Sequence, residues 1–139
     1  MKERDNINNK AQNNSETVDE LYEQLGIINL SIDTIFVIVA AISLNIKFLI
    51  WSKVGILDKI NNTKNAEKIG DLSELPRVAN LMYIYATGIF LLINYSQFQN
   101  ISLLKETTKR QECKAWKAFL SSLFIFIATG LTRDNLEVW

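Results

Sequence analysis

The chain has 139 residues, a formal net charge of zero and a hydrophobic fraction of 48%. This length allows one compact unit, and the balanced charge gives no indication of a nucleic-acid partner. The sequence contains no histidine and a single cysteine, Cys113, which excludes Ser-His and Cys-His catalytic pairs, the usual zinc ligand sets and an intramolecular disulfide. We therefore expect no enzymatic activity, no metal and no cofactor.

The first 26 residues divide into a polar tail and a short helix. Residues 1–14 hold too little apolar surface to offset the entropy of ordering, so we expect them to be disordered. In residues 15–26 Val18 and Leu25 share an apolar helix face, and Thr17 with Glu20 fits a capping box. We expect this amphipathic helix to end near Gly26.

The first predicted span, residues 27–51, carries two charges. Between Asp33 and Lys47 lie 13 uncharged residues, which as a helix cover about 20 Å of a hydrocarbon core about 30 Å thick. Lys47 is long enough to extend toward the interface, whereas Asp33 is not. Asp33 is therefore a candidate proton or cation site, or an interfacial carboxylate at the start of the helix.

A polar connection follows at residues 52–77, in which Asp58 is one of several charges expected in solvent. The spacing of Val54 and Ile60 is compatible with an amphipathic continuation of the first helix, and Pro76 fits the first turn of the second. The second span, residues 78–98, gives the strongest signal. It belongs to an uncharged run of 27 residues, 78–104, that would reach about 40 Å as a helix.

The third predicted span, residues 116–132, follows a second polar connection. Residues 105–117 carry five basic side chains, and the uncharged stretch 118–132 is 15 residues long. Flanking cations and the interfacial Trp116 make a thin or tilted crossing feasible.

The predicted fold is therefore all-α: a multi-pass integral membrane protein with three transmembrane helices in a membrane domain of residues 27–139. A soluble helical bundle with unusually apolar helices is the competing interpretation. Frequent Ile, Asn and Lys are typical of AT-rich bacterial genomes, so we expect a bacterial cell membrane. Cations near the spans do not define the orientation, because six lie on one side and seven on the other. The six are Lys10, Lys105, Lys109, Arg110, Lys114 and Lys117; the seven are Lys47, Lys53, Lys59, Lys64, Lys68, Arg77 and Arg133.

Each span has one polar or small face. The candidate intramembrane polar or ion-path residues are Asp33, Lys47, Asn29, Asn80, Thr87 and Asn94. Because lipid cannot satisfy amide and hydroxyl groups, these faces should turn toward one another or toward water. One interpretation is that they join the helices through hydrogen bonds; the other is that several copies assemble so that the stripes line a conducting path.

The function that we expect is that of a small non-enzymatic accessory, partner or immunity-type protein for another membrane component. The alternative is a self-assembling, holin-like pore or small ion channel. A proton or ion carrier that uses Asp33 is a third hypothesis. The expected partners are the lipid bilayer and another membrane protein, or further copies of the chain as a homo-oligomer.

Overall fold

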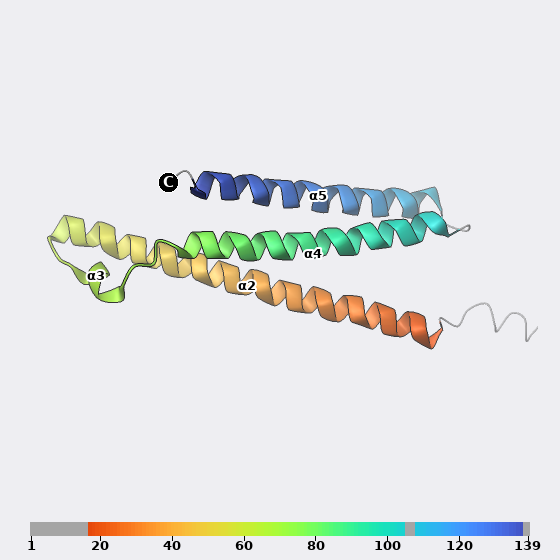
Figure 1. Cartoon of the computed structure of the whole chain (residues 1–139), viewed down its shortest axis with the longest axis horizontal. Helices are drawn as coiled ribbons and strands as arrows, with labels where there is room; N and C mark the ends of the chain where they lie inside the picture. The colour runs from red at the N-terminus through yellow and green to blue at the C-terminus, as the bar shows by residue number, and fades with distance from the viewer. Residues whose placement is uncertain (1–16, 105–107, 138–139) are drawn as a thin grey trace, which may run out of the picture. The chain divides into compact units, whose positions relative to one another are not determined.

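The computed structural model describes residues 17–104 and 108–137, and all regular structure within them is helical (Figure 1). The helices are α2 (Val18–Asn61), α3 (Asn65–Ile69), α4 (Leu75–Leu103) and α5 (Lys109–Glu137). The chain divides into two compact units, Met1–Ile32 and Asp33–Trp139. The predicted disordered tail, residues 1–14, lies outside the described residues.

Three of these helices are long and apolar enough to cross a bilayer. The most apolar 18-residue windows reach a mean hydropathy of 2.2 in α2 and 1.4 in each of α4 and α5. The predicted spans 27–51, 78–98 and 116–132 fall inside these helices. The all-helical class and the three helices of membrane-spanning length are thus confirmed.

Helix α2 begins where the sequence predicts but continues past the predicted end. The Thr17 N–H donates to Glu20 Oε2 at 2.8 Å, and the Glu20 N–H donates to Thr17 Oγ1 at 3.4 Å, which completes the capping box. The predicted break at Gly26 is wrong, because α2 runs on to Asn61. A glycine inside a helix costs only about 1 kcal/mol relative to alanine, which good helix formers on both sides can offset.

Helix α5 begins earlier than predicted. Residues 109–117, assigned from their charges to a connection, are helical. A second capping box explains the start, since the Thr108 N–H donates to Gln111 Oε1 at 3.1 Å and the Gln111 N–H donates to Thr108 Oγ1 at 3.4 Å. The basic residues of this segment therefore lie on a helix and not in a loop.

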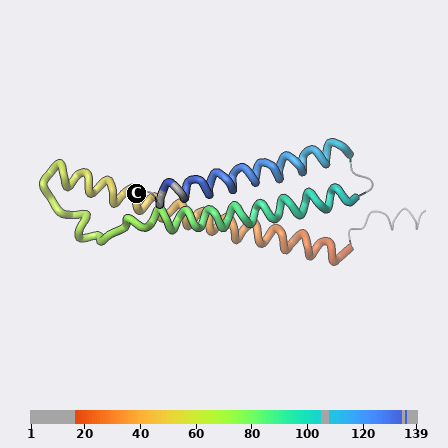
Figure 2. Tube along the Cα trace, turned by 45° about the horizontal axis from the view of Figure 1, so that its top comes forward, coloured from red at the N-terminus to blue at the C-terminus, as the bar shows by residue number. Residues whose placement is uncertain are grey.

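Helices α4 and α5 pack side by side and antiparallel, as both views show (Figures 1 and 2). Residues near the end of α4 contact residues near the start of α5, and the reverse holds at the other end of the pair. At one end the ring of Phe98 lies 5.4 Å from that of Trp116, and at the other Asn80 bonds to Thr129. Aromatic contacts and small buried residues, among them Ala79 and Ala86, thus hold the pair together along its length.

Between α2 and α4 the chain turns through two special backbone positions. Asn62 follows α2 with φ 52°, and the Thr63 N–H donates to the Asp58 carbonyl at 3.0 Å. This is the Schellman arrangement that commonly ends helices. Gly70 closes α3 at φ 93° and ψ 175°, a region that is essentially restricted to glycine. Pro76 lies in the first turn of α4, as predicted.

Candidate functional site

Asn80 joins α4 to α5. The residue is 5% exposed, and its Nδ2 donates to the Thr129 carbonyl at 3.3 Å. Thr129 Oγ1 in turn donates to the Ile125 carbonyl of its own helix at 2.7 Å. Among the described residues Asn80 Oδ1 is buried without a hydrogen-bond partner. The nitrogen of the Asn80 amide therefore joins the two helices, whereas its oxygen does not.

Thr87 and Asn94 follow Asn80 at intervals of seven residues and are half-buried. Thr87 Oγ1 donates to the Tyr83 carbonyl at 2.7 Å, within α4 itself. Directly after Thr87, Gly88 lets the ring of Phe126 come close to the backbone, because a Cβ built on Gly88 would lie 3.4 Å from Phe126 Cε2. The polar residues of α4 are thus part of a packed helix surface.

The candidate residues of α2 are placed differently. Asn29, Asp33 and Lys47 are all exposed. Among the described residues, the side chains of Asp33 and Lys47 have no hydrogen bond or ion pair. The structure therefore does not bring these charges into contact with Asn80, Thr87 or Asn94, and it leaves the polar face of α2 uncovered.

The two charges of α2 that lie within the predicted first span, Asp33 and Lys47, are on one line along the helix. Asp33, Ala40 and Lys47 are seven residues apart, so they drift by only about 40° around the axis. The buried residues of α2 within the same segment, Thr34 and Ala41, are 2% and 0% exposed. Because successive residues of a helix point about 100° apart, the charged line and the buried side are distinct faces. We call the first the α2 polar face and define it by Asp33, Phe36, Ala40, Ser43 and Lys47.

The α2 polar face contains little that could satisfy its charges. Ser43 Oγ donates to the Val39 carbonyl at 2.9 Å and so is bonded within its own helix. Phe36 is 67% exposed, and Ala40 is exposed as well. A lipid-facing carboxylate or ammonium costs about 3 kcal/mol at the bilayer centre, and the cost falls toward the interface. The face is therefore unfavourable in lipid unless a partner or water contacts it.

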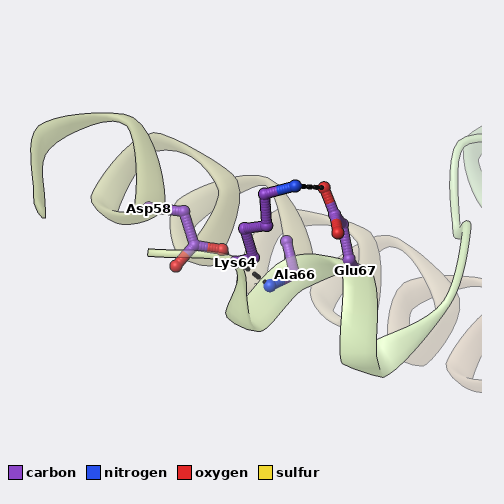
Figure 3. Close-up of polar contacts among 4 residues, drawn as sticks. All are labelled: Asp58, Lys64, Ala66 and Glu67. Atoms are coloured by element: carbon purple, nitrogen blue, oxygen red, sulfur yellow. Dashed lines mark hydrogen bonds and ion pairs between the residues drawn. The ribbon is translucent and has the colours of Figure 1, made fainter. Parts of the chain in front are cut away.

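Outside the predicted spans, Asp58 forms a site that the sequence interpretation missed. Expected in solvent, it is 8% exposed. Its Oδ2 accepts from the Ala66 N–H at 2.7 Å, and Oδ1 accepts from Asn65 Nδ2 at 3.0 Å and from the Thr63 hydroxyl. Figure 3 shows the bond to Ala66 beside the exposed ion pair of Lys64 and Glu67. The signal was the group Asp58, Thr63 and Asn65 directly around the end of a helix.

These donors stabilise the charged form of Asp58. The hydroxyl of Thr63 contributes most, the backbone N–H of Ala66 next, and together they lower the pKa from 3.8 to about 2. An open hollow beside Asp58 is lined by Lys59, Asn62 and Glu67 among others. Since three donors already occupy the carboxylate, Asp58 serves the turn between α2 and α3 and is a poor ligand for anything else.

Neither clustered ligands nor relatives point to a particular chemistry. Within the described part of the chain, no group of three or more His, Cys, Asp or Glu side chains could hold a metal ion. No family model matches the chain, and neither curated proteins nor solved structures give a significant match. The α2 polar face is therefore the feature of the molecule from which a function can be inferred.

Proposed function

We propose that this chain is a small, non-enzymatic protein of the cell membrane that acts by binding another membrane component through the α2 polar face. The observation that carries the proposal is the exposure of Asp33 and Lys47 in the middle of an apolar helix. Contact with complementary groups would offset the cost of these charges in lipid. An accessory, partner or immunity-type role fits such a surface.

The contrast between the helices supports this proposal. Asn80 and Thr87 have hydrogen bonds to protein atoms. The side chains of Asp33 and Lys47 have none among the described residues. If the three helices needed no partner, the protein would be more stable in the membrane with these charges covered or replaced by apolar residues. Their presence on an open face is typical of an interaction surface.

Pore formation is the second candidate, and the same face favours it. In a ring of several copies the α2 polar faces could line a water-filled path, with Asp33 and Lys47 as charged rings near its two ends. The α4 residues contribute less to this model, since Asn80 is buried against α5. The two proposals differ in the permeability of the membrane to ions, which a pore would raise and a binding role would leave unchanged.

Co-purification and membrane potential test both proposals. Chemical cross-linking in membranes followed by purification should recover the chain in a complex. Asp33→Asn should lower that recovery, while Asp19→Asn, an exposed position on α2 outside the predicted span, should not. The membrane potential of the expressing cells should stay intact. Recovery as a free monomer would contradict the binding role, and a collapsed potential sensitive to Asp33→Asn would favour the pore.

A further inference from the structure

We propose that the component bound by the α2 polar face is a second copy of this chain, inserted in the opposite orientation, so that the two α2 helices run antiparallel with Ala40 at their crossing. The inference rests on the proposed function, because it names the partner of the same face. It follows from the positions of the charges, the residue between them and the distribution of cations along the chain.

The charges are complementary under a twofold axis. In an antiparallel pair centred on Ala40, Asp33 of one copy lies beside Lys47 of the other, and the symmetry forms this ion pair twice. A parallel pair would instead place Asp33 beside Asp33 and Lys47 beside Lys47. Each charge lies seven residues from Ala40, about 10 Å along the axis, so the two pairs form at equal distances from the centre.

The centre of the face suits a close crossing. Ala40 has a small side chain and is exposed, and small residues let transmembrane helices approach to roughly 8 Å. On either side, Phe36 of one copy comes level with Leu44 of the other. Close approach brings the Asp33 carboxylate and the Lys47 ammonium within reach and excludes lipid from both.

The depth of the helix in the bilayer also fits. Inversion keeps the two α2 helices level when Ala40 lies near the bilayer midplane. The nearest other charges on α2 are Glu23 and Lys53, and the 29 residues between them are centred on residue 38. That is about 3 Å from Ala40 along the helix, so upright and inverted copies place their charges at nearly the same depth.

Insertion in both orientations requires a weak topological preference. Orientation follows the excess of Lys and Arg in short loops on one side of the membrane. Apart from Lys47, which lies within the span, each side carries six cations near the spans. Equal numbers are the pattern expected for a chain that inserts both ways.

The single cysteine tests the orientation on the natural chain. Cys113 is exposed near the start of α5. On intact cells an impermeant maleimide should label about half of the copies, and the rest should react after lysis. Asn61→Cys in a Cys113→Ser chain places the thiol at the opposite end of the spans. The maleimide should again label about half of the copies on intact cells. Labelling of all copies or of none at Cys113 would overturn the proposal.

A charge exchange tests the pairing. In the Cys113→Ser background, Ala40→Cys should give a disulfide-linked dimer under oxidation. Asp33→Asn or Lys47→Gln should weaken self-association by about tenfold, whereas the matched change Lys53→Gln should leave it unchanged. The exchange of both charges, Asp33→Lys with Lys47→Asp, should restore dimerisation to within about twofold.

The outcomes separate this inference from the proposed function. If the α2 polar face cross-links to a different membrane protein while Cys113 has one orientation, the binding role stands and the inverted dimer falls. Failure of the charge exchange to restore dimers of correctly inserted chains would also overturn the dimer. If the face cross-links to nothing, the proposed function falls with it.

Discussion

Asp58 Oδ2 accepts a hydrogen bond of 2.7 Å from the backbone N–H of Ala66, so a side chain in the last turn of α2 caps the first turn of α3. The same carboxylate accepts from Thr63 on the intervening turn and from Asn65, the first residue of α3. One residue thus fixes the direction in which the chain leaves α2 and heads toward α4.

This relationship predicts a pH dependence for the turn. The Asp58 pKa is lowered from 3.8 to about 2 in the folded chain, so its stabilising contribution is fully present above about pH 4 and is lost as the pH falls toward 2. Amide hydrogen exchange at Ala66, corrected for intrinsic rates, should accelerate across that interval. Asp58→Ala should show fast exchange already at pH 7, and a carboxyl that titrates near 4 would contradict the contact.

The hydrogen bond between α4 and α5 should contribute modestly to stability. Asn80→Ala is expected to lower the free energy of unfolding by about 1 kcal/mol, since interhelical hydrogen bonds in membranes are worth roughly 0.6 to 2 kcal/mol. Removal of the buried Oδ1 atom offsets part of the loss. Denaturant unfolding in detergent micelles measures the change. A loss above about 3 kcal/mol would mean that Asn80 has a further role.

The aromatic cluster should be worth more than any single hydrogen bond. The ring of Phe119 lies 5.6 Å from Tyr95, 5.7 Å from Trp116 and 6.1 Å from Phe98. Phe119→Ala should therefore destabilise the pair of helices by about 2 kcal/mol or more. Phe124, on the same helix but 62% exposed, is the matched control, and Phe124→Ala should change the unfolding free energy little. Equal effects of the two changes would contradict the packing.

Gly88 and Gly130 form a second matched pair. A side chain at Gly88 meets the ring of Phe126 at Cβ, whereas a Cβ on Gly130 meets nothing within 4 Å. Gly88→Leu should cost about 1 to 3 kcal/mol through overpacking. Gly130→Leu should cost little by the same unfolding assay. The reverse order would show that α4 and α5 pack through other faces.

The sequence predicted the spans and several helix starts because those signals are local. The uncharged run 78–104, the capping box of Thr17 with Glu20 and the position of Pro76 depend on few neighbours. The break at Gly26 was wrong, because a single glycine is a weak signal inside a long helix. Charge alone also placed residues 109–117 in a connection, although charged residues are common on exposed helix ends.

The candidate site was predicted in composition but not in arrangement. Periodicity found the polar stripes, yet it could not show that Asn80 would be buried against α5 while Asp33 and Lys47 stayed exposed. That difference depends on which face of each helix packs against another helix. This is a property of the tertiary structure, which the periodicity of one segment does not contain. Asp58 was missed for a similar reason, since its donors become partners only when the chain turns back after Asn62.

Photo-cross-linking from α2 in intact membranes tests the central claim most directly. A photoreactive side chain at Phe36, on the α2 polar face, should capture a protein partner in high yield. The same group at Ile42, which is 45% exposed but points about 120° or more away from Ala40 and Phe36, should capture lipid. Cross-linking to protein at Phe36 and not at Ile42 is the predicted result. Equal capture at both positions, or protein at neither, would contradict a binding role for the α2 polar face.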